Sequence, residues 1–297
     1  MLRPGSGLAP RAADLYERLS CVGLVYVTVN YGFVLLPMYI YPNPGAWDPL
    51  FSAAKANPNV TFQAVVNPWN GPGAGSCPDT NFINATAYLN AIPNIKTLAY
   101  VHTANQYNCG PYGNWICPCS QTLSALEANI TTYQNWPTAG CSTNNAKDIH
   151  IDGIFFDEAP TDVNCTAYMK NATAFAKKTL THGNTVLFNA GGAVNASYWS
   201  IADYINVFED SEAAYDTANI GALDGQGAYH AQSTMIIYGD SDESTTMHRD
   251  VNTILSTKND AMAGLYITDK TIYSQFPGNW TGFVNEVAAV VKANMAG

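Results

Sequence analysis

The chain has 297 residues, of which 47% are hydrophobic and only 12% charged, with 13 basic and 23 acidic side chains. This length is enough for one α/β barrel of about 250 residues, and the hydrophobic share is enough for its core. Because the basic residues are scattered singly and the formal net charge is −10, the composition argues against nucleic acid or an anionic membrane surface as a partner.

The N-terminal stretch differs from the rest of the chain. Three arginines precede an uncharged run that begins at Leu19, an order typical of a signal peptide or signal anchor. Asn30 and Pro37 weaken the interpretation as a membrane span. We assign residues 1–32 to a leader, an anchor or a non-native extension, and residues 33–297 to one domain. Beyond such an anchor, we expect no strong membrane association.

Eight short segments rich in β-branched and aromatic residues follow, and each is typical of a strand. They are Phe33–Tyr41, Val60–Asn67, Lys96–His102, Asp152–Asp157, Thr185–Asn189, Tyr204–Glu209, Thr234–Tyr238 and Gly264–Thr268. The fourth segment is an almost continuous apolar run, which indicates a strand of a parallel sheet with both faces buried.

Between the strands, most segments carry apolar residues at helical spacing or open on an acidic cap. The predicted helices are Asp48–Ala56, Asp79–Ala91, Ser120–Asn135, Asn164–Thr181, Ser244–Leu255 and Asn279–Met295. Eight strands alternating with helices predict a single (β/α)8 barrel. A doubly wound open sheet is the alternative, because the links around 190–203 and 211–222 are short. No phosphate-binding or dinucleotide-binding fingerprint follows a strand, which favours the barrel.

Cysteines and glycosylation sequons both indicate a secreted protein. The seven cysteines are Cys21, Cys77, Cys109, Cys117, Cys119, Cys141 and Cys165. We interpret the last six as up to three disulfides of open pairing, and Cys21 as the one left over. Zinc or free thiols are the alternative, but Cys117 and Cys119 are spaced too tightly for the usual zinc site. The Asn-x-Ser/Thr sequons begin at Asn59, Asn84, Asn129, Asn164, Asn171, Asn195 and Asn279.

Acidic side chains stand at the carboxyl ends of two predicted strands, where the site of a (β/α)8 barrel is built. Asp157 and Glu158 follow the fourth strand, and Glu209 ends the sixth. Carboxylates in this position suit acid/base or nucleophilic catalysis. The structural alternative is that Asp157 caps a helix and that the glutamates are solvated loop acids. Asp210 and Glu212 are nearby substitutes for Glu209.

The other strand ends carry amides, aromatic rings and one histidine. The candidate substrate-binding residues are Tyr41, Asn67, Trp69, Tyr100, His102, Asn189, Tyr238 and Asp269. Aromatic rings stack on sugar faces, and amides hydrogen-bond hydroxyl or acetamide groups, so this set together with the carboxylates predicts a glycoside hydrolase. Since metal and cofactor fingerprints are missing, we expect neither. Asp152, at the opposite end of the fourth strand, is assigned to the stability face of the barrel.

Three motifs of this chain resemble the spherulin-4-like family, which includes glycoside hydrolase family 135 of fungi. They are Leu36–Pro42 (LPMYIYP), Val66–Pro68 with the Gly-rich loop after it, and Ile151–Pro160 (IDGIFFDEAP). The resemblance covers roughly residues 33–295, and the Asp-Glu pair of the fourth strand is its most specific part. It implies a (β/α)8 fold, an extracellular or cell-surface location, and endo-type cleavage of an N-acetylgalactosamine-containing polymer, galactosaminogalactan.

The resemblance also assigns residues. The tandem acids of the family match Asp157 and Glu158, and its further Glu best matches Glu209, with Glu212 as the alternative. The resulting hypothesis is a secreted, monomeric endo-glycosidase acting on an amino-sugar polysaccharide. Glu209 or Glu158 would protonate the leaving oxygen, and Asp157 would attack the anomeric carbon or orient the substrate's acetamide. The alternatives are a non-catalytic spore or cell-wall protein that binds polysaccharide, and a glycosidase of different linkage specificity.

Overall fold

The computed structural model describes residues 32–104, 119–225, 227–241, 244–259 and 261–296. Except for Gly32, the segment predicted to be a leader, anchor or extension lies outside these ranges, as do Cys21, Cys109 and Cys117.

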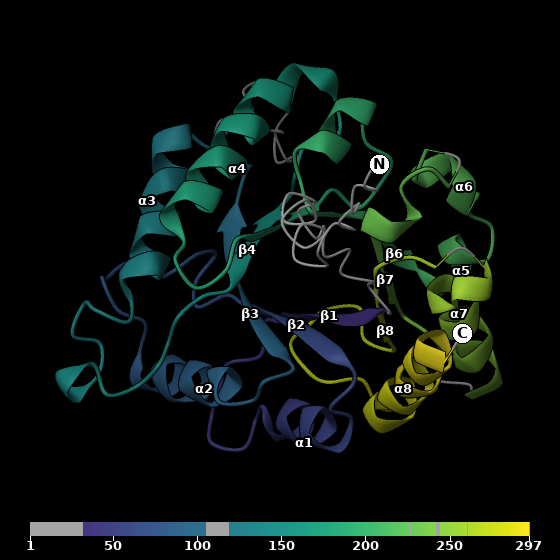
Figure 1. The fold of residues 1–297 in the computed structure, drawn as a ribbon, viewed down its shortest axis with the longest axis horizontal. Helices are drawn as coiled ribbons and strands as arrows, with labels where there is room; N and C mark the ends of the chain where they lie inside the picture. Colours follow the sequence, from purple (N-terminus) through teal and green to yellow (C-terminus); the bar gives the residue numbers. More distant parts are fainter. Residues whose placement is uncertain (1–31, 105–118, 226, 242–243, 260, 297) are drawn as a thin grey trace, which may run out of the picture. The chain divides into compact units, whose positions relative to one another are not determined.

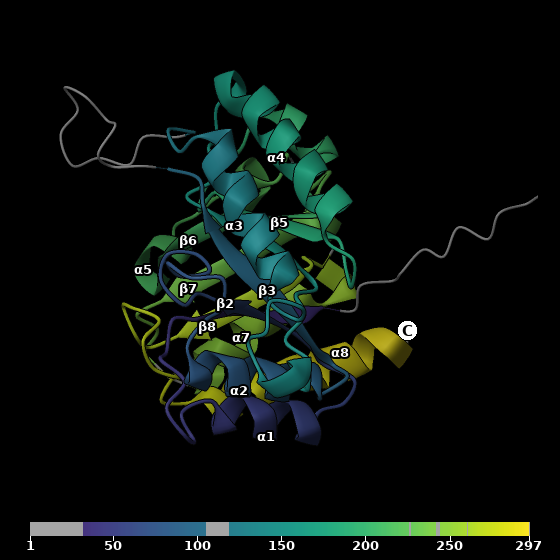
Figure 2. The same ribbon diagram turned by 90° about the vertical axis from the view of Figure 1, so that its left-hand side faces the viewer.

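Eight parallel strands pair in chain order and close into a barrel (Figures 1 and 2). They are β1 (Phe33–Met38), β2 (Thr61–Val66), β3 (Ile95–His102), β4 (Gly153–Asp157), β5 (Thr185–Asn189), β6 (Tyr204–Ser211), β7 (Ser233–Tyr238) and β8 (Gly264–Thr268). Because β1 pairs with β8, from Phe33 opposite Gly264, the (β/α)8 prediction is confirmed and the open-sheet alternative is wrong.

All six predicted helices are present, and they lie outside the strands in Figure 1. They are α1 (Asp48–Ala56), α2 (Thr80–Asn90), α3 (Leu123–Asn135), α4 (Thr166–Thr179), α7 (Ser244–Leu255) and α8 (Trp280–Ala296). The acidic cap of α2 is real, since the Asp79 carboxylate accepts hydrogen bonds from the backbone N–H groups of Asn81 and Phe82. The two short links hold only the 3-10 helix η6 (Ala196–Ser200) and the short helices α5 (Glu212–Tyr215) and α6 (Ile220–Leu223).

The seam where the barrel closes depends on a glycine. A Cβ atom on Gly264 would lie 2.3 Å from the Phe33 ring, so no larger residue fits there without displacing that ring. Phe33 is buried in turn, with its ring edge-on to Tyr204 at a centroid distance of 5.0 Å. The closure of the barrel is therefore specified by side-chain volume at the first residue of β8 as well as by strand pairing.

Two disulfides join loops that are distant in sequence. Cys77–Cys141 ties the segment before α2 to the segment after α3, and Cys119–Cys165 ties the segment before α3 to the start of α4. The disulfide interpretation is confirmed for these four cysteines. Within the described ranges, no group of His, Cys, Asp and Glu side chains could hold a metal ion. Over those same residues, no helix has both the length and the apolar character needed to cross a membrane.

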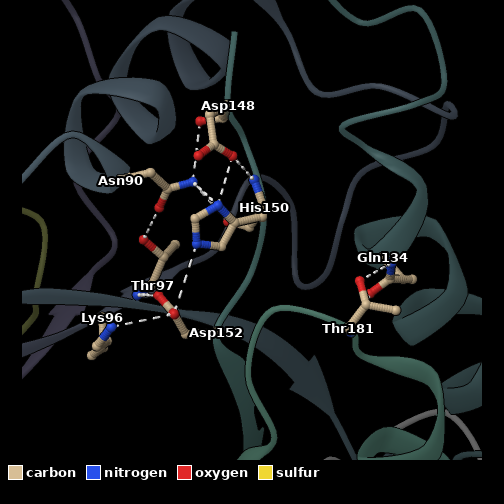
Figure 3. A network of polar contacts seen from close by, with 8 residues as sticks. All are labelled: Asn90, Lys96, Thr97, Gln134, Asp148, His150, Asp152 and Thr181. Atoms are coloured by element: carbon tan, nitrogen blue, oxygen red, sulfur yellow. Dashed lines mark hydrogen bonds and ion pairs between the residues drawn. The ribbon is translucent and has the colours of Figure 1, made fainter. Parts of the chain in front are cut away.

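A polar network closes the amino-terminal end of β4 (Figure 3). Asp152 immediately precedes this strand, and its Oδ2 accepts a hydrogen bond of 2.9 Å from the backbone N–H of Thr97. Its Oδ1 lies 3.6 Å from Lys96 Nζ and 3.7 Å from His150 Nε2. The other ring nitrogen of His150 is 2.6 Å from the Asp148 carboxylate. Asp152 therefore joins β3, β4 and the segment before β4, far from the carboxyl ends of the strands.

This network makes stability depend on pH. The close contact with the Asp152 carboxylate raises the pKa of His150, although burial opposes it. Burial raises the pKa of Asp152, but the contact with His150 and the hydrogen bond from the Thr97 backbone outweigh it and hold the pKa below its usual value. The raised pKa of His150 stabilises the folded protein fully below about pH 6.5, and the lowered pKa of Asp152 stabilises it fully above about pH 4. The stabilisation from this pair is therefore largest between about pH 4 and pH 6.5.

Replacing His150 by Gln should therefore lower the free energy of unfolding by an amount that peaks near pH 5, on the order of 1–2 kcal/mol. The difference from the wild type should shrink toward pH 8 as the imidazolium is lost, and toward pH 3 as the carboxylates are protonated. Urea unfolding at a series of pH values checks this. A difference that does not change between pH 5 and pH 8 contradicts it.

Candidate active site

A cavity of about 490 Å³ opens at the carboxyl ends of the strands. Its wall combines acidic, amide and small residues that follow β1, β4 and β5 or lie on β4, β5 and β6. The lining residues are Tyr39, Asp157, Glu158, Ala159, Pro160, Thr161, Asn189, Ala190, Gly191 and Glu209. The three acids predicted to be catalytic therefore share one cavity wall.

Asp157 is the last residue of β4, and donors hold both of its carboxyl oxygens. Tyr100 Oη donates to Oδ2 at 2.7 Å, and Asn189 Nδ2 donates to Oδ1 at 2.7 Å. Burial raises the pKa of Asp157, and these two hydrogen bonds offset the rise only in part. The carboxyl group is thus fixed in orientation, and its neutral form is more accessible than that of an exposed aspartate.

Glu158 turns into the same cavity because its backbone leaves the strand geometry. Its φ of 52° lies in the left-handed region, which a non-glycine residue rarely adopts. The Thr103 hydroxyl lies 2.8 Å from the carbonyl oxygen of Asp157 and 2.7 Å from that of Glu158, and so pins this turn. In a continuing strand, Glu158 would point to the side opposite Asp157. The strained turn is what places two consecutive acids on one cavity.

His102, at the end of β3, contacts the Glu158 carboxylate through Nε2. Burial lowers the pKa of His102, but the hydrogen bond and the negative charge of Glu158 raise it by more, so the net shift is upward. The contact with Glu158 therefore favours the imidazolium form of His102. Both side chains remain partly exposed, at 23% and 26%, so water or a ligand reaches them.

Glu209 faces the cavity because β6 contains a β-bulge. The side chain of Asn206 points toward β5 and β7, where it bonds Asn189 and Thr234. In a regular strand Glu209, three residues later, would point the opposite way. Asn206 pairs with Thr234 of β7, and Glu209 pairs with Ile236 of β7, with a register shift between Asn206 and Phe208. The chain thus advances three residues along β6 but only two along β7. The extra residue, Val207, thus returns Glu209 to the cavity side.

The Glu209 carboxylate is also held at both oxygens. Tyr273 Oη donates to Oε1 at 2.6 Å, and Asn189 Nδ2 donates to Oε2 at 2.7 Å. Burial and then the nearby charge of Asp157 raise the pKa of Glu209, against hydrogen bonds from Tyr273 and Asn189 that lower it. Since Asn189 Nδ2 is 2.7 Å from an oxygen of each acid, those oxygens of Asp157 and Glu209 lie within twice that distance of each other.

Of the predicted substrate-binding residues, Tyr100, His102 and Asn189 contact the catalytic candidates, and five others lie away from the lining of this cavity. Tyr41 packs on Phe82 at 5.7 Å and accepts a hydrogen bond from Asn81. It misses the cavity because β1 ends at Met38, three residues before the predicted end of the strand.

The remaining four lie at or just after the carboxyl ends of β2, β7 and β8. Asn67 shapes its own loop by accepting a hydrogen bond from Gly71 N at 3.1 Å, and Trp69 in that loop is 82% exposed. Tyr238 donates to Asp210 at 3.1 Å. Asp269 accepts from Gly278 N at 2.9 Å and is paired with Lys270. Their roles in binding substrate remain predictions.

Three residues of the site were not among the sequence candidates. Tyr39 lines the cavity, with its ring edge-on to Tyr100 at 5.7 Å and to Tyr273 at 5.9 Å. Alternation from Pro37 in β1 would have indicated it. Asn206 is fully buried, and a lone amide within an apolar strand was a usable signal. Tyr273 lies in the loop after β8, and we find no local signal that predicts its contact with Glu209.

Comparisons with known proteins agree with the barrel fold. The family model of spherulation-specific family 4 matches residues 33–287. A search of curated protein sequences found no match. The crystal structure of Aspergillus clavatus Sph3 in complex with GalNAc is similar at 30% identity, with a TM-score of 0.74, covering 86% of this chain and 97% of that one. A chitinase from Bacteroides thetaiotaomicron, at 13% identity and a TM-score of 0.51, covers 88% and 96% and shares the fold.

Proposed function

The chain belongs to spherulation-specific family 4, and we propose that it is a glycoside hydrolase that cleaves an N-acetylgalactosamine-containing polysaccharide at internal linkages. The observation that carries this proposal is that the Asn189 amide binds two part-buried carboxyl groups, those of Asp157 and Glu209. A third acid, Glu158, lines the same cavity. The similarity to Sph3, whose structure contains GalNAc, supports the choice of an amino sugar.

Glu209 is the proton donor in this proposal. A general acid needs a pKa above the ordinary carboxyl value, and both burial and the charge of Asp157 raise the pKa of Glu209. It gives its proton to the glycosidic oxygen, the bond from that oxygen to the anomeric carbon breaks, and the leaving sugar departs as an alcohol. The resulting Glu209 carboxylate then takes a proton from the attacking water, which restores the acid for the next cycle.

Asp157 orients the substrate and stabilises the positive charge that develops at the anomeric carbon. Because Tyr100 and Asn189 hold both of its oxygens, its position is fixed before the substrate arrives, which suits orientation of an acetamide better than attack on carbon. Glu158, ion-paired with His102, adds a second negative charge on the same wall.

Release of reducing ends tests the proposal. Purified protein would be incubated with galactosaminogalactan, chitin and a polymer without amino sugars. Asp157→Asn and Glu158→Gln should each lower the rate strongly, whereas Asp210→Asn should not, because that rim acid bonds Tyr238 outside the cavity. Products of mixed length would support internal cleavage, and single residues released from one end would oppose it. The proposal fails if both cavity variants keep full activity.

The same assay separates the non-catalytic alternative. A spore or cell-wall protein that only binds polysaccharide would retain the polymer in a pull-down without releasing reducing ends, and it would tolerate acid-to-amide changes. Cleavage of another polymer alone would indicate a different linkage specificity.

The proposed location is extracellular or at the cell surface, and the proposed assembly is a monomer. The disulfides Cys77–Cys141 and Cys119–Cys165 and the seven sequons support the oxidising compartment. Detection of the protein with its disulfides intact in culture medium or on the cell wall tests the location, and size-exclusion chromatography with light scattering tests the assembly.

A further inference from the structure

A chain of buried polar side chains runs across three strands behind the catalytic candidates. Thr234 Oγ1 on β7 donates to Asn206 Oδ1 on β6 at 3.2 Å, and Asn206 Nδ2 donates to Asn189 Oδ1 on β5 at 2.7 Å. Thr234 and Asn206 are fully buried, and Asn189 is 8% exposed. Buried polar groups in a barrel interior cost stability unless each is bonded, so this chain is a specific arrangement.

The chain determines which end of the Asn189 amide faces the acids. With Oδ1 occupied by Asn206, both protons of Nδ2 point toward the cavity, one to Asp157 and one to Glu209. The reversed amide would set its carbonyl oxygen against two carboxyl groups and its N–H groups against a donor. The hydrogen bond from Asn206 therefore penalises the reversed orientation.

The backbone of β6 supports the same arrangement. Gly191, just after β5, donates its N–H to Asn206 O at 3.0 Å and accepts at its carbonyl from Glu209 N at 3.3 Å. The bulge at Val207 lies between these two contacts, so Gly191 spans the bulged segment of β6 on its β5 side. Gly191 has a φ of 64°, a conformation that favours glycine. One loop residue thus braces the segment that presents both Asn206 and Glu209.

We propose that Asn206 and Thr234 are positioning residues, which act through Asn189 to hold Asp157 and Glu209 as one preorganised pair. The effect of these two residues on catalysis rests on the proposed function. Their effect on the pKa values of Asp157 and Glu209 is a property of the protein without substrate. Neither Asn206 nor Thr234 is among the residues that line the cavity, so their effect on the acids is indirect.

Several other groups act on the same two acids, and the test must separate their effects. Tyr100, His102 and Glu158 act on Asp157 from β3 and the end of β4, and Tyr39 interacts with it electrostatically across the same cavity. Tyr273 bonds Glu209 from the loop after β8, and Tyr238 on β7 interacts with it. In the described part of the chain, none of these groups is hydrogen-bonded to the Asn206 or Thr234 side chain, so the side-chain route from either position to the acids runs through Asn189.

The first test is Asn206→Leu, which keeps the approximate volume and removes the donor to Asn189 without adding a charge. Carbon-13 NMR of labelled carboxyl groups should show Asp157 and Glu209 both titrating at higher pH than in the wild type, because hydrogen bonds from Asn189 favour their ionised forms. With polymer substrate, kcat should fall about 10- to 100-fold with KM little changed.

Asn294→Leu is the matched control. Asn294 is also a buried amide, 7% exposed, which accepts from Thr257 and donates to Leu255 O at 2.7 Å on the outer helices. Both variants should lose stability in urea unfolding, but only Asn206→Leu should shift the two carboxyl titrations. A purely structural role for Asn206 would move neither titration beyond the control.

A second pair of variants follows the chain one step further. Thr234→Val removes the hydroxyl that bonds Asn206 and keeps the shape, whereas Thr234→Ser keeps the hydroxyl. We expect Thr234→Val to shift both titrations upward by less than Asn206→Leu does, and Thr234→Ser to titrate like the wild type.

Unchanged titrations in folded Asn206→Leu overturn the inference, as does a shift of Asp157 or Glu209 alone. Because the titrations need no substrate, shifted titrations in a protein that cleaves no polymer would leave the positioning role standing and count against the proposed function instead.

Discussion

Glu209→Gln should lower kcat on the polysaccharide by about 10²–10⁴-fold, the usual contribution of a positioned general acid. The glutamine keeps the size of the side chain and still accepts the hydrogen bond from Tyr273, but it has no proton to give. Aryl glycosides with an acidic phenol as leaving group need little protonation, so on these the same variant should lose far less. Initial rates on both substrates measure the difference.

Glu212→Gln is the control for this prediction, because Glu212 was the sequence alternative and instead accepts a hydrogen bond of 2.9 Å from Ser241 N. We expect it to keep polymer-cleaving activity. If Glu209→Gln lost equal activity on both substrates, Glu209 would not be the proton donor. If Glu158→Gln alone showed rescue on the aryl glycoside, the donor role would pass to Glu158.

Asp152→Ala should lower the free energy of unfolding by about 2–4 kcal/mol while leaving kcat of the folded protein unchanged. Asp152 is 9% exposed and accepts from the Thr97 backbone, so its removal leaves a buried N–H without its acceptor and His150 without one of its two carboxylates. Urea unfolding at neutral pH gives the stability, and active-site-normalised rates give kcat.

Asp157→Asn is the counterpart on the same strand, and it should show the reverse pattern of near-normal stability and a large loss of kcat. The two acids are five positions apart, at opposite ends of β4. A loss of kcat in Asp152→Ala that persists under conditions where it is fully folded would contradict this division between a stability face and a catalytic face.

The fold could be predicted from the sequence because each strand carries its own local signal. The predicted runs Asp152–Asp157 and Thr185–Asn189 are short, largely apolar and rich in aromatic or β-branched residues, and the structure has strands at Gly153–Asp157 and Thr185–Asn189. The short links after β5 and β6 left the open sheet as an alternative. What excluded it is the pairing of Phe33 with Gly264, a contact between residues that are far apart in the chain.

The site could be predicted only where position along a strand is enough to place a side chain. Asp157 follows from the end of β4, but the cavity-facing direction of Glu158 depends on its left-handed backbone, and that of Glu209 depends on the bulge at Val207. Neither feature has a glycine or other marker at that residue. Tyr39 rather than Tyr41 lines this cavity because the predicted strand ran past its true end at Met38, and the role of Tyr41 in binding substrate stays a prediction.

A crystal structure of the Asp157→Asn variant with an N-acetylgalactosamine oligosaccharide would show directly whether Glu209 and Asp157 act on the substrate as proposed. We expect a glycosidic oxygen within hydrogen-bond distance of the Glu209 carboxyl, about 2.6–3.2 Å, and the acetamide of the adjoining sugar against residue 157. An oligosaccharide bound only on the exposed rim around Trp69 and Tyr41, with the cavity between Glu158 and Glu209 empty of sugar, would contradict this expectation.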